Sequence, residues 1–179
     1  DYTYNAMDTL THPEHEYWKG TPDGFKITEN KTVVDTKCPF TLESFCKLIS
    51  PLYNDLEGID AMNALRNGYT DKTGLFQAPH GDAEKYYWQL VSNGILTGKN
   101  IAELIIYCPY LKELVDIKTE LANYEGDQND VAWINWAKDE ELPYLIEGNY
   151  YKNLYKFEFE IPEEDKQALY DRVKLACSL

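Results

Sequence analysis

Residues 21 to 39 read Thr-Pro-Asp-Gly-Phe-Lys-Ile-Thr-Glu-Asn-Lys-Thr-Val-Val-Asp-Thr-Lys-Cys-Pro. Asp23 stands beside Gly24, which allows the chain to bend sharply and leaves the carboxylate at the end of a strand. The run from Lys31 to Lys37 predicts a strand, in which side chains two residues apart share one face. Asp35 and Lys37 should therefore point the same way, with Cα atoms roughly 6 to 7 Å apart.

This pair of acids and the lysine suit phosphodiester chemistry. Two carboxylates can hold Mg²⁺, and a neighbouring ammonium can orient a water molecule or stabilise charge on a phosphate. The same Asp-x-Lys spacing also occurs as a solvated pair on a sheet face, so the spacing alone leaves both readings open. The second acid just upstream, in a tight turn, favours the site.

Longer motifs carry a family resemblance. The chain holds Thr21-Pro-Asp-Gly24, Asp35-Thr-Lys-Cys-Pro-Phe-Thr41, Tyr86-Tyr-Trp-Gln89, Ile95-Leu-Thr-Gly-Lys99 and Ile105-Ile-Tyr-Cys-Pro109. In this order they resemble the phage lambda exonuclease family, the YqaJ-type viral recombinases of the PD-(D/E)XK nuclease superfamily. The resemblance covers roughly residues 9 to 110 and is weaker beyond them.

The resemblance implies a role for each matching residue. Asp23 and Asp35 would be metal ligands, with the backbone carbonyl of Thr36 as a third, and the metal would be Mg²⁺ or Mn²⁺. Lys37 would contact the attacking water or the scissile phosphate, and Gln89 would position that water or Lys37. The implied fold is α/β (α+β), a restriction-endonuclease-like core with a mixed central sheet flanked by helices.

The sequence departs from the family pattern in three ways. The middle acid is usually glutamate, whereas Asp35 is one methylene shorter, and Cys108 stands where the family often has an acid before proline. A further glutamate is expected on a helix upstream of Asp23. We therefore expect residues 1–179 to be a single nuclease domain that lacks its N-terminal helical part, or Glu14 or Glu16 to replace that glutamate.

The activity implied is that of a metal-dependent exonuclease that degrades double-stranded DNA ends from 5′ to 3′ in phage recombination. The resemblance also implies a ring-shaped, trimeric homo-oligomer and a single-strand annealing protein as partner. Two alternatives stay open: a structure-specific or restriction-like endonuclease of the same superfamily, and a degenerate domain that only binds a partner.

The amino-acid composition limits which of these functions are possible. The 179 residues are 44% hydrophobic and 14% aromatic, which favours one folded domain over disorder. No stretch approaches the roughly 18 apolar residues of a membrane span, and the start of the chain does not resemble a signal peptide. We expect a cytoplasmic protein, phage-encoded or of a bacterial host, with four buried free cysteines. The formal net charge of −14 opposes DNA binding, since proteins that bind phosphates usually cluster Lys and Arg.

Periodicity predicts the elements around the motifs. A hairpin joins residues 25–28 to residues 32–38 with its turn at Glu29-Asn30, and 101–107 and 150–161 are further strands. Thr41 and Asp82 should cap helices over 42–49 and 83–96. Other helices are expected near 59–65, 111–124, 131–139 and after Pro162, the last with Leu169, Val173 and Ala176 inward.

Two further groups of residues allow a structural interpretation as well as a functional one. His12, Glu14, His15 and Glu16 suggest a metal cluster, but their spacing fits no helical zinc motif, and a surface strand is the favoured interpretation. Trp133 and Trp136 have helical spacing, which is typical of packing.

Overall fold

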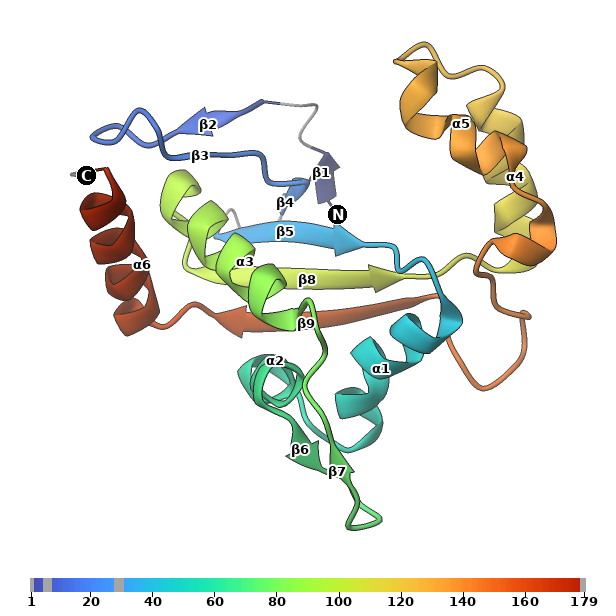
Figure 1. Cartoon of the computed structure of the whole chain (residues 1–179), viewed down its shortest axis with the longest axis horizontal. Coiled ribbons are helices and arrows are strands. Elements are labelled where there is room, and N and C mark those ends of the chain that lie inside the picture. Colours follow the sequence, from blue (N-terminus) through green and yellow to red (C-terminus); the bar gives the residue numbers. More distant parts are fainter. Residues whose placement is uncertain (1, 5–7, 28–30, 178–179) are drawn as a thin grey trace. The chain divides into compact units, whose positions relative to one another are not determined.

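The computed structural model describes residues 2–4, 8–27 and 31–177. The chain forms two compact units, and Figure 1 labels the helices and strands that make them up. The first unit comprises residues 1–36, 50–105 and 156–179, and the second comprises residues 37–49 and 106–155. The predicted turn at Glu29-Asn30, with Thr28, lies outside the described residues.

The main sheet has five strands in the order β1-β4-β5-β8-β9. Their bounds are β1 Tyr2–Tyr4, β4 Gly24–Lys26, β5 Thr32–Lys37, β8 Ile101–Tyr107 and β9 Leu154–Glu160. β4 pairs antiparallel with both β1 and β5, as the predicted hairpin requires. The β5 and β8 arrows point the same way and the β9 arrow runs against them (Figure 1). The sheet is therefore mixed, and the predicted α/β class is confirmed.

Most of the helices begin or end near their expected positions. They are α1 Leu42–Tyr53, α2 Gly58–Asn67, α3 Ala83–Thr97, α4 Leu111–Leu121, α5 Gln128–Trp136 and α6 Glu163–Ala176, with a 3₁₀ turn at Asp139–Glu141. The Thr41 hydroxyl accepts the Ser44 N–H at 3.1 Å, which confirms the predicted cap. α1 continues four residues beyond the expected Ile49, through Pro51.

Two short hairpins complete the first unit. Their strands are β2 Leu10–Thr11 with β3 Lys19–Gly20, and β6 Tyr69–Thr70 with β7 Phe76–Gln77. The β6–β7 turn is held by Asp71, whose carboxylate accepts the backbone N–H groups of Thr73 and Leu75. Four hydrogen bonds to this carboxylate, with that from the Thr73 hydroxyl the strongest influence, lower the pKa of Asp71 to about 2.

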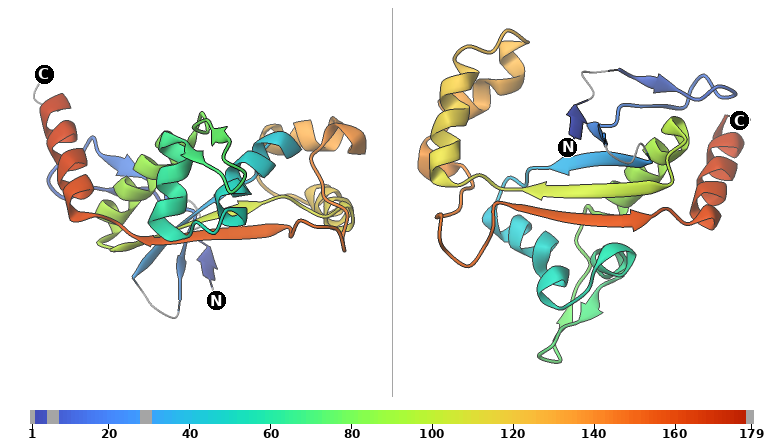
Figure 2. Two further views of the ribbon diagram at one scale, coloured as in Figure 1. Left: turned by 90° about the horizontal axis from the view of Figure 1, so that it is seen from below. Right: turned by 180° about the vertical axis from the view of Figure 1, so that it is seen from behind.

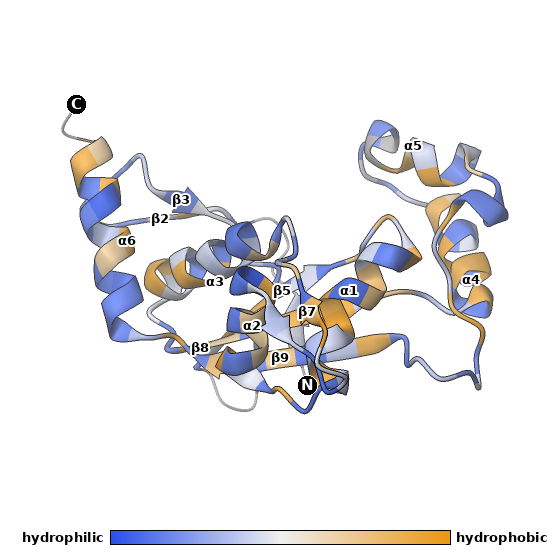
Figure 3. Ribbon diagram, turned by 60° about the horizontal axis from the view of Figure 1, so that its bottom comes forward, coloured by the Kyte–Doolittle hydropathy of each residue, from blue (hydrophilic) through white to orange (hydrophobic). Residues whose placement is uncertain are grey.

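The core of the first unit lies between α3 and one face of the sheet. Tyr87 of α3 is buried and stacks on Phe159 of β9, with ring centroids 5.8 Å apart. Val33 and Phe157 are buried completely, and the view from behind in Figure 2 places α3 beyond the strands. Figure 3 shows how hydrophobic residues alternate with hydrophilic ones along these strands. Period-two alternation in β9 thus buries Phe157 and Phe159, and Ile161 just after the strand is buried as well, as the sequence predicts.

Several expectations about exposure are wrong. Cys38 and Cys177 are exposed and Cys46 is half-buried, so Cys108 alone of the four free cysteines is buried. An apolar neighbourhood in sequence does not determine which face a residue occupies. Trp133 and Trp136 are likewise exposed rather than packed, and Ala176 of α6 faces solvent while Leu169 and Val173 are half-buried.

Two local predictions also need correction. Asp82 occupies the N-cap position of α3, but its side chain makes no cap hydrogen bond. Residues 12–17 form the turn between β2 and β3 instead of a strand. In that turn the His12 ring stacks on Trp18, with centroids 4.9 Å apart, and on His15 at 5.1 Å. Among the described residues, no helix is long and apolar enough to cross a membrane.

Candidate nuclease site

Asp23 and Asp35 come together through the register of the β4–β5 hairpin. Gly24 pairs with Val34 and Phe25 with Val33. One further step in this register sets Asp23 opposite Asp35. Residues directly opposed in an antiparallel pair share a face, with Cβ atoms about 4.5 to 5.5 Å apart. This register, continued one residue beyond β4, places the two predicted acids side by side.

The main chain fixes the Asp23 carboxylate. Its Oδ2 accepts the backbone N–H of Thr36 at 2.6 Å, so this side chain reaches across to the residue after Asp35. A hydrogen bond from a backbone N–H to a carboxylate is charge-assisted and therefore short. The contact orients Asp23 toward β5.

Gly24 is required for a reason other than the predicted bend. It is a residue of β4 with ordinary backbone angles, and a Cβ there would lie 2.6 Å from the carbonyl oxygen of Thr3 in β1. No real Cβ approaches a backbone atom so closely. Glycine thus allows β1 to pack beside β4, next to the acid.

Asp35 is fully buried and is held by α3. The Gln89 side chain donates from Nε2 to Oδ1 of Asp35 at 2.8 Å. Gln89 lies in the middle of α3, seven residues after the N-cap, where the helix passes the sheet. Gln89, a residue placed from sequence, is thus in contact with one of the two acids. Its contact is with Asp35, whereas its predicted role concerned a water molecule or Lys37.

Tyr86 is a neighbour of this site that sequence reasoning did not single out. It lies three residues before Gln89, so the two side chains share one side of α3. Burial raises the pKa of the Tyr86 hydroxyl, and the negative charges of Asp82 and Asp35 raise it further. The i, i+3 spacing to Gln89 is the signal in the sequence that indicates it.

Thr36 and Lys37 complete the predicted set. Thr36 is exposed and contributes its N–H to Asp23; its carbonyl as a metal ligand stays a prediction. Lys37 is the last residue of β5 and is half-buried. Because side chains alternate along a strand, Lys37 is still expected to share a face with Asp35. The role of Lys37 stays a prediction.

The donor set suits a hard divalent cation. Two carboxylates and a backbone carbonyl offer oxygen ligands alone, which Mg²⁺ and Mn²⁺ prefer over the nitrogen and sulfur ligands of zinc. Each carboxylate has two oxygens, and the hydrogen bonds described above use Oδ2 of Asp23 and Oδ1 of Asp35. Within the described parts of the chain, however, no three His, Cys, Asp or Glu side chains gather as a metal site, so neither Glu14 nor Glu16 supplies a third acid.

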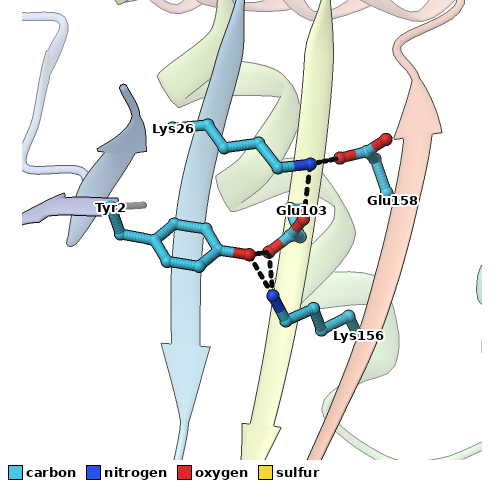
Figure 4. A network of polar contacts seen from close by, with 5 residues as sticks. All are labelled: Tyr2, Lys26, Glu103, Lys156 and Glu158. Carbon is cyan, nitrogen blue, oxygen red and sulfur yellow. Dashed lines mark hydrogen bonds and ion pairs between the residues drawn. The ribbon is translucent and has the colours of Figure 1, made fainter. Parts of the chain in front are cut away.

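A second charged cluster lies on the opposite face of the sheet. Glu103 of β8 is buried, and its carboxylate accepts the Tyr2 hydroxyl at 2.5 Å and lies 3.3 Å from the Lys26 ammonium. Lys156 stands 3.8 Å from Glu103, and Lys26 also contacts Glu158 (Figure 4). Lys26 neighbours Phe25 in β4, so alternation places this cluster away from Val33 and Asp35.

Comparison with known proteins gives one similar structure. No protein-family model matches the sequence, and no curated protein matches it. The fold is similar to a phage-related exonuclease from Haemophilus somnus 129PT, with a TM-score of 0.48 and 14% identity. The match covers 97% of this chain and 57% of that one, so this chain spans somewhat more than half the length of that protein.

Proposed function

We propose that this chain is a divalent-metal-dependent deoxyribonuclease that degrades the ends of double-stranded DNA. The observation that carries the proposal is the pairing of Asp23 with Asp35 beneath Gln89. Spacing in the sequence indicated the two acids and the family resemblance indicated Gln89. Two hydrogen bonds link them to one corner of the sheet: Asp23 to Thr36 at 2.6 Å and Gln89 to Asp35 at 2.8 Å.

Each residue has a role in this proposal. Asp23, Asp35 and the Thr36 carbonyl would hold Mg²⁺ or Mn²⁺, and Gln89 would keep the Asp35 carboxylate oriented. A bound cation supplies Lewis-acid polarisation of the phosphate and lowers the pKa of a coordinated water molecule. Lys37 would donate hydrogen bonds to the scissile phosphate or orient the attacking water.

The family resemblance extends the proposal to biology. Digestion would run from 5′ to 3′, a trimeric ring would enclose the duplex, and a single-strand annealing protein would receive the product strand in recombination. The net charge of −14 opposes this proposal, and bound cations would offset part of the repulsion between the acids and the phosphates.

The test is degradation of a linear duplex labelled at one 5′ or one 3′ end, with Mg²⁺ and with chelator. We expect loss of the duplex with Mg²⁺ only, and loss of activity by at least about 100-fold in Asp23→Asn and Lys37→Ala. Glu16→Gln, in the exposed β2–β3 turn, is the matched control and should keep full activity. Retained activity in both site variants would show that the site is assigned wrongly, and cutting of closed circular DNA would favour the endonuclease.

A degenerate, non-catalytic domain is the second candidate. It is favoured by the lack of a third acid beside Asp23 and Asp35 among the described residues. Isothermal titration with Mn²⁺ separates the two candidates: heat of binding that disappears in Asp23→Asn supports the nuclease, and no binding at millimolar Mn²⁺ supports the degenerate domain.

A further inference from the structure

An open groove of about 550 Å³ lies wholly within the second unit. Phe40 and Leu42 line one side of it, and Leu142, Tyr144 and Ile146 line the rest. Glu140 and Glu141 add two carboxylates to the lining. The groove therefore combines an apolar interior with negative charge.

Backbone contacts hold this groove in shape. Leu145 donates its N–H to the Pro109 carbonyl at 2.8 Å, and its own carbonyl accepts the Leu111 N–H at 3.0 Å. On the other side, the Lys118 ammonium donates to the Ala137 carbonyl at 2.7 Å and pairs with Asp139 at 2.6 Å. The segment from 137 to 146 is thus tied to α4 at both of its ends.

Large apolar side chains remain exposed beside the groove. Phe40 is 74% exposed, and its ring lies 5.3 Å from that of Trp133. Trp136, one turn further along α5, is 83% exposed, and Ile146 is 56% exposed. Clustered exposed aromatic residues at a groove are typical of protein interfaces, where Trp and Phe act as anchors.

Charge decides which class of partner fits. The second unit carries eleven acids against six lysines and no arginine. Aromatic side chains can stack on nucleic-acid bases, but the phosphates between those bases would face an excess of negative charge here. Glu140 is exposed, and no ion pair involves it among the described residues. A polypeptide with Lys or Arg beside apolar anchors satisfies both the groove and its carboxylates.

We propose that this groove binds an apolar segment of a partner protein that carries basic side chains. Apolar anchors of the segment would occupy the space between Phe40 and Ile146. Its Lys or Arg side chains would pair with Glu140 and Glu141. The proposal does not depend on nuclease activity.

The probe is a fluorescein-labelled amphipathic peptide of leucine and lysine, titrated by anisotropy against the whole chain. We expect saturable binding that weakens at least about tenfold in Phe40→Ala and in Glu140→Lys, because each removes one of the two kinds of contact. Phe76→Ala and Glu16→Lys are matched controls in the first unit, with similar exposure and the same change of charge. Both controls should bind as the unchanged chain does.

Four results would overturn the proposal. They are equal binding by Phe40→Ala, equal binding by Glu140→Lys, equal binding of a leucine–glutamate peptide, and binding of a thymidine oligonucleotide that Phe40→Ala abolishes. A dimer in light scattering that Phe40→Ala converts to a monomer would instead assign the groove to a second copy, which also contradicts the proposal. Circular dichroism of each variant checks that it is folded.

Discussion

The contact between Gln89 and Asp35 gives the sharpest test of the site. In Gln89→Glu, a carboxylate replaces the amide that donates at 2.8 Å to the fully buried Asp35. Loss of a hydrogen bond to a charged group costs about 1.5 to 3 kcal/mol. Two carboxylates about 4 Å apart add repulsion of about 4 kcal/mol at an effective dielectric constant of about 20.

Protonation limits this penalty. At pH 7, keeping the introduced carboxyl neutral costs about 4 kcal/mol from its ordinary pKa of about 4.3. We therefore expect the free energy of unfolding to fall by about 4 kcal/mol at pH 7. The repulsion raises the pKa of the introduced carboxyl in the folded state, so the deficit is absent below about pH 4, grows as the pH rises from the ordinary pKa toward the raised one, and is constant above it.

Urea unfolding at pH 7 and pH 4.5 measures this deficit. Gln77→Glu is the matched control, because Gln77 makes the same amide-to-carboxylate bond at 2.7 Å to Asp71, and both of these residues are half-buried whereas Asp35 is fully buried. Solvent screens that pair, so its loss should be much smaller and less dependent on pH. A deficit in Gln89→Glu no larger than in the control at pH 7 would refute the contact with a buried Asp35.

Three other perturbations test the surrounding structure. Gly24→Ala places a Cβ 2.6 Å from the Thr3 carbonyl oxygen, so it should destabilise the fold by about 1 to 3 kcal/mol and expose the β1 amides to faster hydrogen exchange. Glu103→Gln should lower the free energy of unfolding by about 1.5 to 3 kcal/mol, because it removes the buried charge that Tyr2 and Lys26 contact while Lys26 keeps its pair with Glu158, and chemical denaturation measures the loss. Because the pKa of Asp71 is lowered to about 2, its ionised carboxylate contributes to the stability of the fold above pH 4, and this contribution is lost as the pH falls toward 2. Nuclear magnetic resonance titration of the β6–β7 turn should show a midpoint near 2. A midpoint near 4 would contradict the expectation.

Much of the fold follows from local patterns. The apolar run of Ile101 to Tyr107 predicts β8 to the residue, because a strand covered on both faces needs little polar alternation. The alternation around Phe157 and Phe159 predicts the buried face of β9. Thr41 predicts the start of α1, since its hydroxyl satisfies a helix N–H within three residues. Each of these signals depends on neighbours in sequence.

The candidate site is predictable in part for the same reason. The spacing of Asp23 and Asp35 is set by one hairpin, so the sequence can indicate that they meet. The bond from Gln89 to Asp35 joins residues 54 positions apart and depends on how α3 lies across the sheet. The sequence locates Gln89 by resemblance, while its actual partner emerges only from the fold.

Long-range burial is what the sequence does not reveal. Glu103 looks like an interruption of an apolar strand, yet its partners Tyr2 and Lys156 come from opposite ends of the chain. The exposure of Trp133 and Trp136 is equally invisible in their helical spacing, since spacing defines a face of the helix but not what covers that face.

The bond between Asp23 and the main chain at position 36 has a consequence for mutational tolerance. The donor is a peptide N–H, which every residue except proline possesses, and the Thr36 side chain is exposed. A library randomised at position 36 should therefore yield folded proteins that keep the Asp23 hydrogen bond for nearly all amino acids. Proline is the one residue that should fail.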